Sequence, residues 1–498
     1  MEYMKKTVNI GSRRELFVDD EMFLDVGSAR FVAHQPQPRE IAVGRDTLAD
    51  DAWTSYYSII HDGTKYLLYY TAHGWDGMME GEWPHQHICR AESTDGIHWE
   101  KPNYGIYEFR GTKENNIVYL LEGDLLDNFG VMYDTNPNCP ENERYKALAE
   151  RVIDKKAVLN AVVSADGIHW EDRGTVITDG TFDSLNTCYY DPQEDLYHAY
   201  TRGWEIHNPS RFVGESDETD FKREDAQKAR SITAFTSKDF YHWSEGQPLD
   251  YGTAHSYQLY TNNIGPYYRA PHMIFGFPTR YFERTFKRMF RELPKGKKMT
   301  FPEGEPVGRG VTALTDGLFM TSRDGIHFTR YDDCPIFPSG IEGQGNWIYG
   351  DGYGANGMYE TPSDRPEEPN VISLLVPDNA YGAMRRYEMR LDGFVSLHAG
   401  CDETVIVSHP FIFDGDRLEF NYKTTVAGSF YVELLDLQKN PYPGFEMSQC
   451  DEMFGDTVAR DISWNENHDV GSLKGKPVIL RIKMKECDLY SFRFYSAQ

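Results

Sequence analysis

Three aspartates stand shortly before strand-like runs at comparable places in the chain. Asp51, Asp127 and Asp183 precede runs that begin at residues 53, 129 and 188. Glycoside cleavage needs such groups, because one carboxylic acid protonates the leaving oxygen while one carboxylate attacks the sugar or activates water. A separation of about 5–5.5 Å predicts retention of configuration, and about 6.5–9.5 Å predicts inversion. The matching positions indicate one shared site; the alternative is that each aspartate is an ordinary loop carboxylate.

A second set of polar and aromatic residues lies near the same strand starts. The aromatic members could form a platform for a sugar ring, and core packing is the competing explanation for each of them. Arg269, His272 and Arg280 lie near strand ends, where they either bind an anionic or hydroxyl-rich substrate or only anchor a hairpin. The residues predicted to bind substrate are Trp53, Asn128, Asn263, Arg269, His272, Arg280, Asn346, Trp347 and Tyr349.

The sequence predicts no metal ion and no cofactor. His85 and His87 lie near Glu80 and Glu82, but their irregular spacing does not match a metal-binding motif. The seven cysteines are dispersed without Cys-x-x-Cys spacing, which disfavours a zinc site. The expected chemistry is therefore that of side chains alone.

One short phrase occurs four times and indicates the elements that position these residues. It reads Asp-Gly-Ile-His-Trp or a close variant, and its aspartates are Asp95, Asp166, Asp239 and Asp324. The intervals between these positions are 71, 73 and 85 residues, which indicates one supersecondary unit used repeatedly. Asp-Gly favours a tight turn, and an apolar, strand-like run precedes the phrase. We therefore expect a strand–turn–strand corner and assign the phrase no catalytic part.

Five units of three to four strands predict a five-bladed β-propeller, although the fifth unit lacks the phrase. The innermost strands of a propeller surround a channel, so the residues at their starts would converge at one mouth. Residues 14–20 look like a strand that closes the ring by pairing with the last blade. Residues 203–230 and 283–311 are inserts. The second holds a basic island, interpreted as a solvated helix and loop, with a lid or a subunit contact as alternatives.

The pattern changes after residue 394. Four later runs alternate polar and apolar residues, which is typical of half-buried strands in a sandwich. The fold class is therefore all-β, with a five-bladed propeller over residues 1–398 and a C-terminal β-sandwich over residues 399–498. The sandwich either braces the propeller or binds sugar. The four runs are residues 417–422, 429–434, 478–484 and 489–494.

Bulk composition limits the kind of partner. The formal net charge of −27 would repel nucleic acid and an anionic membrane. Aromatic residues make up 14% of the chain, enough for surfaces that stack on sugars. The first residues lack the apolar run of a signal peptide, no later stretch is long enough to cross a bilayer, and the cysteines look like free thiols. We expect a cytoplasmic protein with a carbohydrate partner, and a homo-oligomer is left open.

The sequence contains several longer motifs. They are Phe-Val-Asp-Asp at residues 17–20, the four repeated phrases, and the segments 180–186, 390–394 and 488–494. Together they resemble a group of bacterial proteins described as glycosyl hydrolases, related to the five-bladed propellers of glycoside hydrolase families 32, 43 and 68. The resemblance to this group extends over nearly the whole chain.

The resemblance also implies roles for the carboxylates. Those families place an Asp in the first blade, an Asp in the second or third, and a Glu acid in the third or fourth. By position, Asp51 resembles the nucleophile or base, Asp127 the orienting carboxylate, and Asp183 stands where an acid is expected. The invertase-type motifs Asn-Asp-Pro-Asn-Gly, Arg-Asp-Pro and Glu-Cys are absent, and the third unit offers Asp instead of Glu. Glu360 and Glu342 are therefore alternative acids.

Three hypotheses follow from the sequence. The first is a glycoside hydrolase that acts on small oligosaccharides or glycosides. The second is a glycoside phosphorylase in which Arg269 and Arg280 would clamp the phosphate. The third is a carbohydrate-binding propeller without catalysis, whose inner carboxylates would lie too far apart to cooperate.

Overall fold

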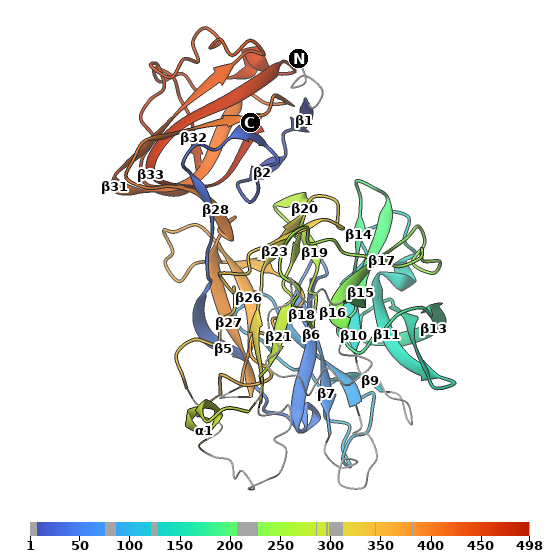
Figure 1. Cartoon of the computed structure of the whole chain (residues 1–498). Helices are drawn as coiled ribbons and strands as arrows, with labels where there is room; N and C mark the ends of the chain where they lie inside the picture. The colour runs from blue at the N-terminus through green and yellow to red at the C-terminus, as the bar shows by residue number, and fades with distance from the viewer. Residues whose placement is uncertain are drawn as a thin grey trace.

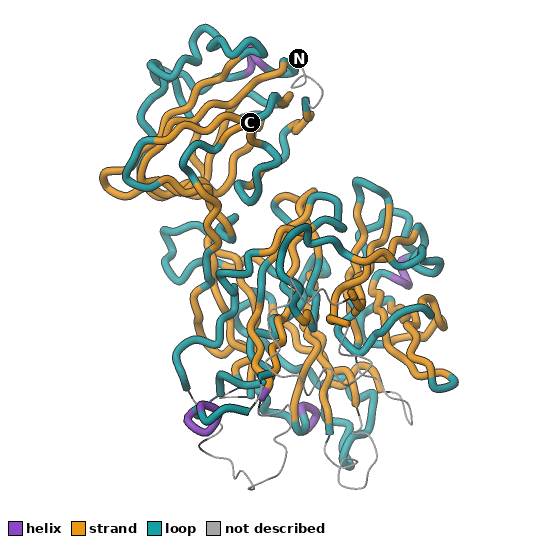
Figure 2. The backbone as a smooth tube through the Cα atoms, in the orientation of Figure 1, coloured by secondary structure: helices purple, strands orange, loops and turns teal. Residues whose placement is uncertain are grey.

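Strands account for almost all regular structure in this protein. The structure is a computed structural model that describes residues 7–74, 86–120, 128–206, 228–284, 286–294, 297, 312–343, 345–379 and 382–497. Within these ranges the helical segments are short, and the α-helix, α1, spans only Met289–Glu292 (Figure 2). The all-β class predicted from the sequence is therefore confirmed.

Five four-stranded antiparallel sheets form the larger part of the molecule (Figure 1). In each sheet the strands pair with their neighbours, because alternating apolar residues and short turns favour hairpins. The first sheet contains β6 (Trp53–His61), β7 (Tyr66–His73), β8 (Gln86–Ser93) and β9 (Ile117–Leu120), and the second contains β10 (Phe129–Tyr133), β11 (Tyr145–Ile153), β12 (Lys156–Ser164) and β13 (Trp170–Ile177). The third contains β14 (Thr187–Asp191), β15 (Leu196–Ile206), β16 (Lys228–Ser237) and β17 (Gln247–Pro248), and the fourth contains β19 (Gly265–Tyr267), β20 (Ala270–Gly276), β23 (Met320–Ser322) and β24 (Phe328–Arg330). The fifth contains β25 (Tyr359–Thr361), β26 (Val371–Asp378), β27 (Ala383–Arg390) and β5 (Gln37–Val43).

The repeated phrase forms the same corner four times. In the first copy, the Asp95 carboxylate accepts hydrogen bonds from the backbone N–H groups of Ile97 and His98, both at 2.8 Å. The His98 ring Nδ1 lies 2.7 Å from the second oxygen of Asp95. The other three copies repeat this pattern with the same partners. Because every Asp–His pair is used locally, the phrase is a structural corner, as the sequence predicted.

Each corner also joins its own sheet to the preceding one. Tyr359 of the fifth sheet donates to Gly96 O at 2.9 Å, Tyr69 of the first sheet donates to Gly167 O at 2.9 Å, and Tyr200 of the third sheet donates to Gly325 O at 3.2 Å. Tyr241 in the third corner donates to Glu143, beside the second sheet, at 2.6 Å. After the fifth sheet, Asp392 accepts from Tyr267 of the fourth at 2.7 Å. The five contacts link the sheets in a closed cycle.

The first strands of these sheets lie at the centre of the cycle. β10 lies between β6 and β14, and β14 contacts β19. Asn356, just before β25, returns to β6, where it donates to Tyr57 O at 2.8 Å and accepts from the Ile59 N–H at 2.7 Å. A small cavity of about 240 Å³ is lined by residues of β6, β10, β14 and β19 and by the segment that leads into β25.

A ten-stranded sheet lies at the top of Figure 1. Its two longest strands, β31 and β33, pair with each other along nearly their whole length. The other edge of β33 pairs with several short strands, one after another. Four separate runs were expected here, and the structure joins them into these two strands of 19 residues each. The members are β1 (Val8–Gly11), β2 (Arg14–Leu16), β3 (Phe23–Asp25), β4 (Arg30–Ala33), β28 (Val395–Ala399), β29 (Thr404–Ser408), β30 (Phe411–Phe413), β31 (Arg417–Leu435), β32 (Asp456–Asp461) and β33 (Pro477–Tyr495).

The N-terminal segment does not have the expected partner. Residues 14–16 form β2, which pairs with β33 in the ten-stranded sheet, and it is β5 that pairs with β27 in the fifth sheet. β28 also begins before residue 399 and pairs with β33. The expected division at residue 398 is therefore corrected, because β1 to β4 and β28 belong to the ten-stranded sheet (Figure 1).

A buried carboxylate connects the ten-stranded sheet to the five smaller ones. Asp392 lies 2.8 Å from Arg269 Nε and 3.4 Å from Arg14 Nη1, and it accepts a hydrogen bond from Ser491 Oγ at 2.6 Å. Burial would raise the pKa of Asp392, but the two guanidinium groups and the hydrogen bonds lower it to about 2. The junction is thus held by an ionised group with partners from both parts.

Two further observations complete the fold. A three-stranded sheet of β18 (Gln258–Leu259), β21 (Thr279–Glu283) and β22 (Ala313–Gly317) lies beside the fourth sheet. The basic island lies partly outside the described residues, and α1 falls within its described part. No helix among the described residues has the length and apolar character needed to cross a membrane.

Candidate active site

A cavity of about 710 Å³ lies where the first strands begin. A volume of this size suits a small organic ligand. It is lined by the start of β6, the end of β7 and β11, and the segments before β14, β19 and β25. The lining residues are Trp53, Thr54, Ser55, Tyr56, Tyr57, His73, Gln86, Glu150, Asp183, Ser184, Leu185, Tyr260, Thr261, Tyr349, Gly350, Tyr353, Gly354, Pro377 and Asn379.

A bulge in β6 shapes one wall of this cavity. The pairing of β6 with β7 shifts between Ser55 and Ser58, and Tyr56 adopts a positive φ of 51°. A bulge turns successive side chains out of the regular alternation, so five consecutive residues from Trp53 to Tyr57 reach the cavity. Positive φ is uncommon for a bulky residue and marks a backbone held by its surroundings.

Glu150 is one of two carboxylates in the cavity lining. It is near the end of β11, opposite Asn128, and only 7% of the residue is exposed. The Asn128 amide donates to Glu150 Oε2 at 3.1 Å and to Phe182 O at 2.7 Å, while Asn186 donates to Asn128 Oδ1 at 2.6 Å. Asn128, predicted to bind substrate, is fully buried and instead positions Glu150.

Asp183 is the second carboxylate. Its side chain is 67% exposed, and its Oδ2 lies 3.0 Å from Arg202 Nη1. Arg202 is a residue of β15, and its backbone forms an isolated antiparallel β-bridge with Thr181. The Arg202 guanidinium lies over the Tyr260 ring, 4.9 Å from the ring centroid. The cavity therefore contains one carboxylate that is accessible and held by a cation, and one that is buried and held by an amide.

His73 adds a neutral base to the same wall. It is the last residue of β7, it stacks on Trp53 with the ring centroids 4.7 Å apart, and its Nε2 lies 2.6 Å from Ser55 Oγ. Burial lowers the pKa of His73 to about 3, and the nearby His87 contributes to the shift. The ring is therefore uncharged at neutral pH. Such a weak base is poorly suited to activate Ser55 as a nucleophile.

The remaining expected catalytic carboxylates lie outside this lining. The buried Asp51 side chain forms an ion pair with Arg110 at 2.8 Å, and its backbone has a positive φ of 48°. Glu360 accepts hydrogen bonds from Tyr268 at 2.9 Å and Asn370 at 2.8 Å, at the other end of the fifth sheet. The structure therefore corrects the convergence expected for Asp51 and Glu360. Asp127 lies outside the described residues.

The three basic residues expected to bind substrate have structural partners. Arg269 binds Asp392 at the junction, His272 lies 3.3 Å from Glu15, and Arg280 binds Asp316 at 2.6 Å. None of the three lines the cavity. Opposing carboxylates hold both Arg269 and Arg280, so this structure gives no support to the expected phosphate clamp.

The other predicted binding residues divide between the cavity and its surroundings. Trp53 and Tyr349 line the cavity. Asn263 is buried deeper, where its amide donates to Gly354 O at 2.7 Å. Asn346 and Trp347 bind backbone carbonyls of the loop before β25, and neither lines the main cavity. The alternative acid Glu342 is exposed on that loop.

The sequence reading missed Glu150, His73 and Ser55. It considered the starts of the first strands, but an antiparallel hairpin returns its second strand to the same mouth. Glu150 is opposite Asn128, and His73 is opposite Trp53. A polar residue near the end of each second strand was therefore a signal that could have been used.

Comparison with known proteins gives structural similarity only. No protein-family profile and no curated protein matches the sequence. Among solved structures, an N-acetylgalactosamine deacetylase from F. plautii has a TM-score of 0.42 at 12% identity, covering 72% of this chain and 93% of that chain. A Bombyx mori GH32 β-fructofuranosidase has a TM-score of 0.39 at 10% identity, covering 94% and 95%.

A family 43 arabinoxylan arabinofuranohydrolase from Bacillus subtilis has a TM-score of 0.37 at 9% identity, covering 93% of this chain and 99% of that chain. Families 32 and 43, which the sequence motifs resemble, are both represented among these structures. All three TM-scores are below 0.5, so the similarity does not extend to function.

Proposed function

We propose that this protein is a glycoside hydrolase that cleaves a small oligosaccharide or glycoside, with Glu150 and Asp183 as its two carboxyl groups. The observation that carries the proposal is that these two residues, from different sheets, line one cavity of about 710 Å³. Paired carboxyl groups at one cavity are what glycoside cleavage requires.

The two environments favour different roles. We assign proton delivery to the leaving oxygen to Glu150, which is buried and accepts a hydrogen bond from the Asn128 amide. Asp183 is accessible and bound to the Arg202 guanidinium, which suits the charged group that attacks the sugar or activates water. These assignments move the role of nucleophile or base from Asp51 to Asp183 and the role of acid from Asp183, or the alternative acids Glu360 and Glu342, to Glu150.

The aromatic lining supports a sugar as the ligand. Five aromatic residues line the cavity: Trp53, Tyr56, Tyr260, Tyr349 and Tyr353. Aromatic rings stack on the apolar faces of sugars, while their polar ends offer hydrogen bonds to hydroxyl groups. With the phosphate clamp removed, hydrolysis is favoured over phosphorolysis.

We further propose that the five four-stranded sheets are the blades of a five-bladed propeller, and that the ten-stranded sheet folds around its own core as a sandwich that braces it. The closed cycle of corner contacts and the central position of β6, β10, β14 and β19 support the first part. The shared core of β30, β31 and β33 side chains supports the second. A cytoplasmic location remains a prediction, and the seven free cysteines support it.

The test is substitution of each carboxylate in the intact protein. Wild type, Glu150→Gln and Asp183→Asn are assayed on a panel of 4-nitrophenyl glycosides and small oligosaccharides, with and without inorganic phosphate. We expect phosphate-independent turnover that falls by about 10²–10⁴-fold in each variant. Asp179→Asn, an exposed change in the same loop, is the matched control and keeps full activity.

Each outcome has a definite reading. Full activity in both Glu150→Gln and Asp183→Asn, with circular dichroism unchanged, would rule out this carboxyl pair. Turnover that requires phosphate would identify a phosphorylase. Sugar binding by calorimetry without any turnover across the panel would favour the carbohydrate-binding alternative.

A further inference from the structure

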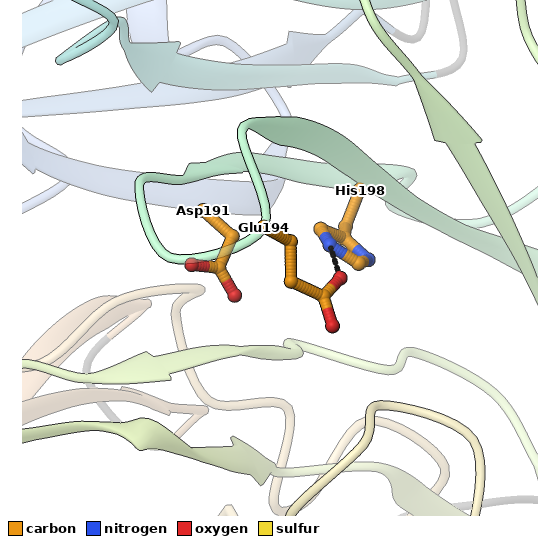
Figure 3. A group of neighbouring side chains, drawn as sticks. All are labelled: Asp191, Glu194 and His198. Carbon is orange, nitrogen blue, oxygen red and sulfur yellow. Dashed lines mark ion pairs between the residues drawn. The ribbon is translucent and has the colours of Figure 1, made fainter.

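A second cluster of polar side chains lies on the hairpin that joins β14 to β15. Asp191 is the last residue of β14, Glu194 is in the turn, and His198 is in β15. One ligand atom from each of these residues lies within 4.8 Å of the others. Figure 3 shows the three side chains on one side of the hairpin, with Glu194 between Asp191 and His198.

His198 is the fixed member of this cluster. The residue is 8% exposed, and its ring stacks on Tyr189 at 5.1 Å with 13° between the planes. Its Nε2 is buried and makes no hydrogen bond, although Glu194 Oε2 lies 3.2 Å away. A buried polar nitrogen without a hydrogen bond is costly, so it calls for a ligand.

The two carboxylates complete a set of donors. Asp191 is oriented by the Gln193 backbone N–H, which donates to its Oδ1 at 2.7 Å. The Glu194 side chain is 54% exposed, so it can move toward an ion at little cost. Asp195, with a positive φ of 55°, accepts from Tyr190 at 2.6 Å and fixes the turn that carries Glu194. Two donors are thus held in place and the third is adjustable.

The corner phrases show how an Asp–His pair looks when it has only a structural part. In each of them the histidine is exposed and its Nδ1 is directed at the aspartate at 2.7–2.8 Å. Among the described residues, none of the four corners brings three possible metal-ligand side chains together. The β14–β15 hairpin differs by having a buried imidazole and two carboxylates at one point.

We propose that Asp191, Glu194 and His198 form a binding site for a divalent transition-metal ion of the Zn²⁺ or Mn²⁺ type. Ligand bonds of about 2.0–2.1 Å in a tetrahedral site place donor atoms about 3.3 Å apart, close to the His198–Glu194 separation. An imidazole nitrogen suits these ions better than Mg²⁺ or Ca²⁺, which favour sites made of oxygen. The two carboxylates balance the charge of the ion.

The site lies away from the main cavity and would act on the fold. Neither Asp191, Glu194 nor His198 lines the 710 Å³ cavity. Tyr189, which stacks on His198, lines the small central cavity instead. A bound ion would therefore fasten the hairpin of the third sheet beside the centre of the molecule, and it has no step in the proposed hydrolysis.

The test is metal binding by the intact chain, freed of metal with EDTA and dialysed. Calorimetric titration with ZnCl₂, MnCl₂ and MgCl₂ compares wild type with His198→Gln and Glu194→Gln. We expect wild type to bind one more equivalent of Zn²⁺ than either variant, or to bind that equivalent at least tenfold more tightly, and to bind Mg²⁺ much more weakly. His242→Gln, in the third corner, is the matched control and binds as wild type does.

A thermal melt gives a second readout. Zn²⁺ should raise the melting temperature of wild type and His242→Gln, because an ion that binds only the folded state stabilises it. It should raise the melting temperature of Glu194→Gln much less, and this exposed substitution preserves the fold even if His198→Gln does not. Equal Zn²⁺ stoichiometry and affinity in wild type and Glu194→Gln, with equal melting shifts, would overturn the proposal.

Discussion

At the scale of single residues, the cavity is defined by how its polar groups are held. Glu150 depends on a relay of two buried amides, Asn128 and Asn186, whereas Asp183 depends on one guanidinium. Asp51 resembles Asp183 in having an arginine partner, but its side chain is buried and does not line the cavity. Accessibility therefore separates the candidates that local sequence could not distinguish.

His73 carries a prediction about pH at this scale. Its folded-state pKa of about 3 lies below the ordinary value of 6.5, so the unfolded chain binds more protons between these values. Its contribution to stability is present above pH 6.5 and is lost as pH falls toward 3. We expect this loss to reach about 3 kcal/mol by pH 4, at about 1.4 kcal/mol per pH unit.

The measurement compares urea unfolding of wild type and His73→Gln from pH 7 to pH 4. Wild type should lose stability more steeply, and the imidazole of His73 should remain neutral by NMR down to about pH 4. An imidazole that titrates near pH 6.5 in the folded protein would contradict the expectation.

The sequence predicted part of this site, for a physical reason. Trp53, Asp183 and Tyr349 were found because the starts of inner strands meet at one mouth. The partners of Arg269 and Arg280 could not be predicted, since Asp392 lies 123 residues from Arg269 and Asp316 lies 36 residues from Arg280. The bulge that turns residues 53–57 into the cavity also left no clear mark in the sequence.

At the scale of elements, the repeated corner is the unit of construction. Its local hydrogen bonds follow from Asp, His and a residue with positive φ, so the sequence alone predicted the corner. The third copy has Phe240 at a φ of 72° where the others have glycine, and its buried ring packs between the second and third sheets. What the local pattern could not predict is the contact that each corner makes with the preceding sheet.

Gly167 tests that contact. Its φ is +69°, and a Cβ there would lie 2.4 Å from Tyr69 Oη and 2.8 Å from the Tyr145 ring. We expect Gly167→Ala to lower the free energy of unfolding by about 2–4 kcal/mol, from backbone strain together with displacement of these rings. Chemical denaturation measures the change.

Gly105→Ala is the matched control for this substitution. Gly105 has nearly the same φ, +68°, but nothing lies within 4 Å of the Cβ position. It should therefore lose only the backbone contribution, about 1–2 kcal/mol. Equal losses in the two variants would mean that the corner does not join the two sheets energetically.

At the scale of the whole molecule, Asp392 connects the two parts. The sequence predicted both parts from their different strand patterns, but it placed the boundary incorrectly. The strands of residues 8–33 are short, and nothing local specifies that β33 is their partner. Long-range pairing of this kind depends on how complete surfaces fit, which a single sequence does not display.

Substitution of Asp392 should weaken the whole fold. Asp392→Asn leaves Arg14 and Arg269 buried without their shared carboxylate, and we expect a loss of about 3–5 kcal/mol in unfolding free energy. Asp456→Asn, which removes an exposed partner of Arg390 nearby, is the control and should change stability by about 0.5 kcal/mol or less.

The Asp392 carboxylate also makes the stability of the protein depend on pH in the acid range. Its folded-state pKa of about 2 lies below the ordinary aspartate value, so its contribution is present above about pH 4 and is lost as pH falls through 2. Wild type should lose about 2–3 kcal/mol more than Asp392→Asn over this range. Parallel stability–pH curves for the two proteins would show that Asp392 does not titrate as described.

The placement of the first strands has a consequence for protein synthesis. Glu40 in β5 bonds Arg386, 346 residues later, and Arg14 in β2 bonds Ser491, 477 residues later. A ribosome makes the early strands long before these partners emerge. The nascent chain therefore carries unpaired edges of β5 and β2 until β27 and β33 have emerged.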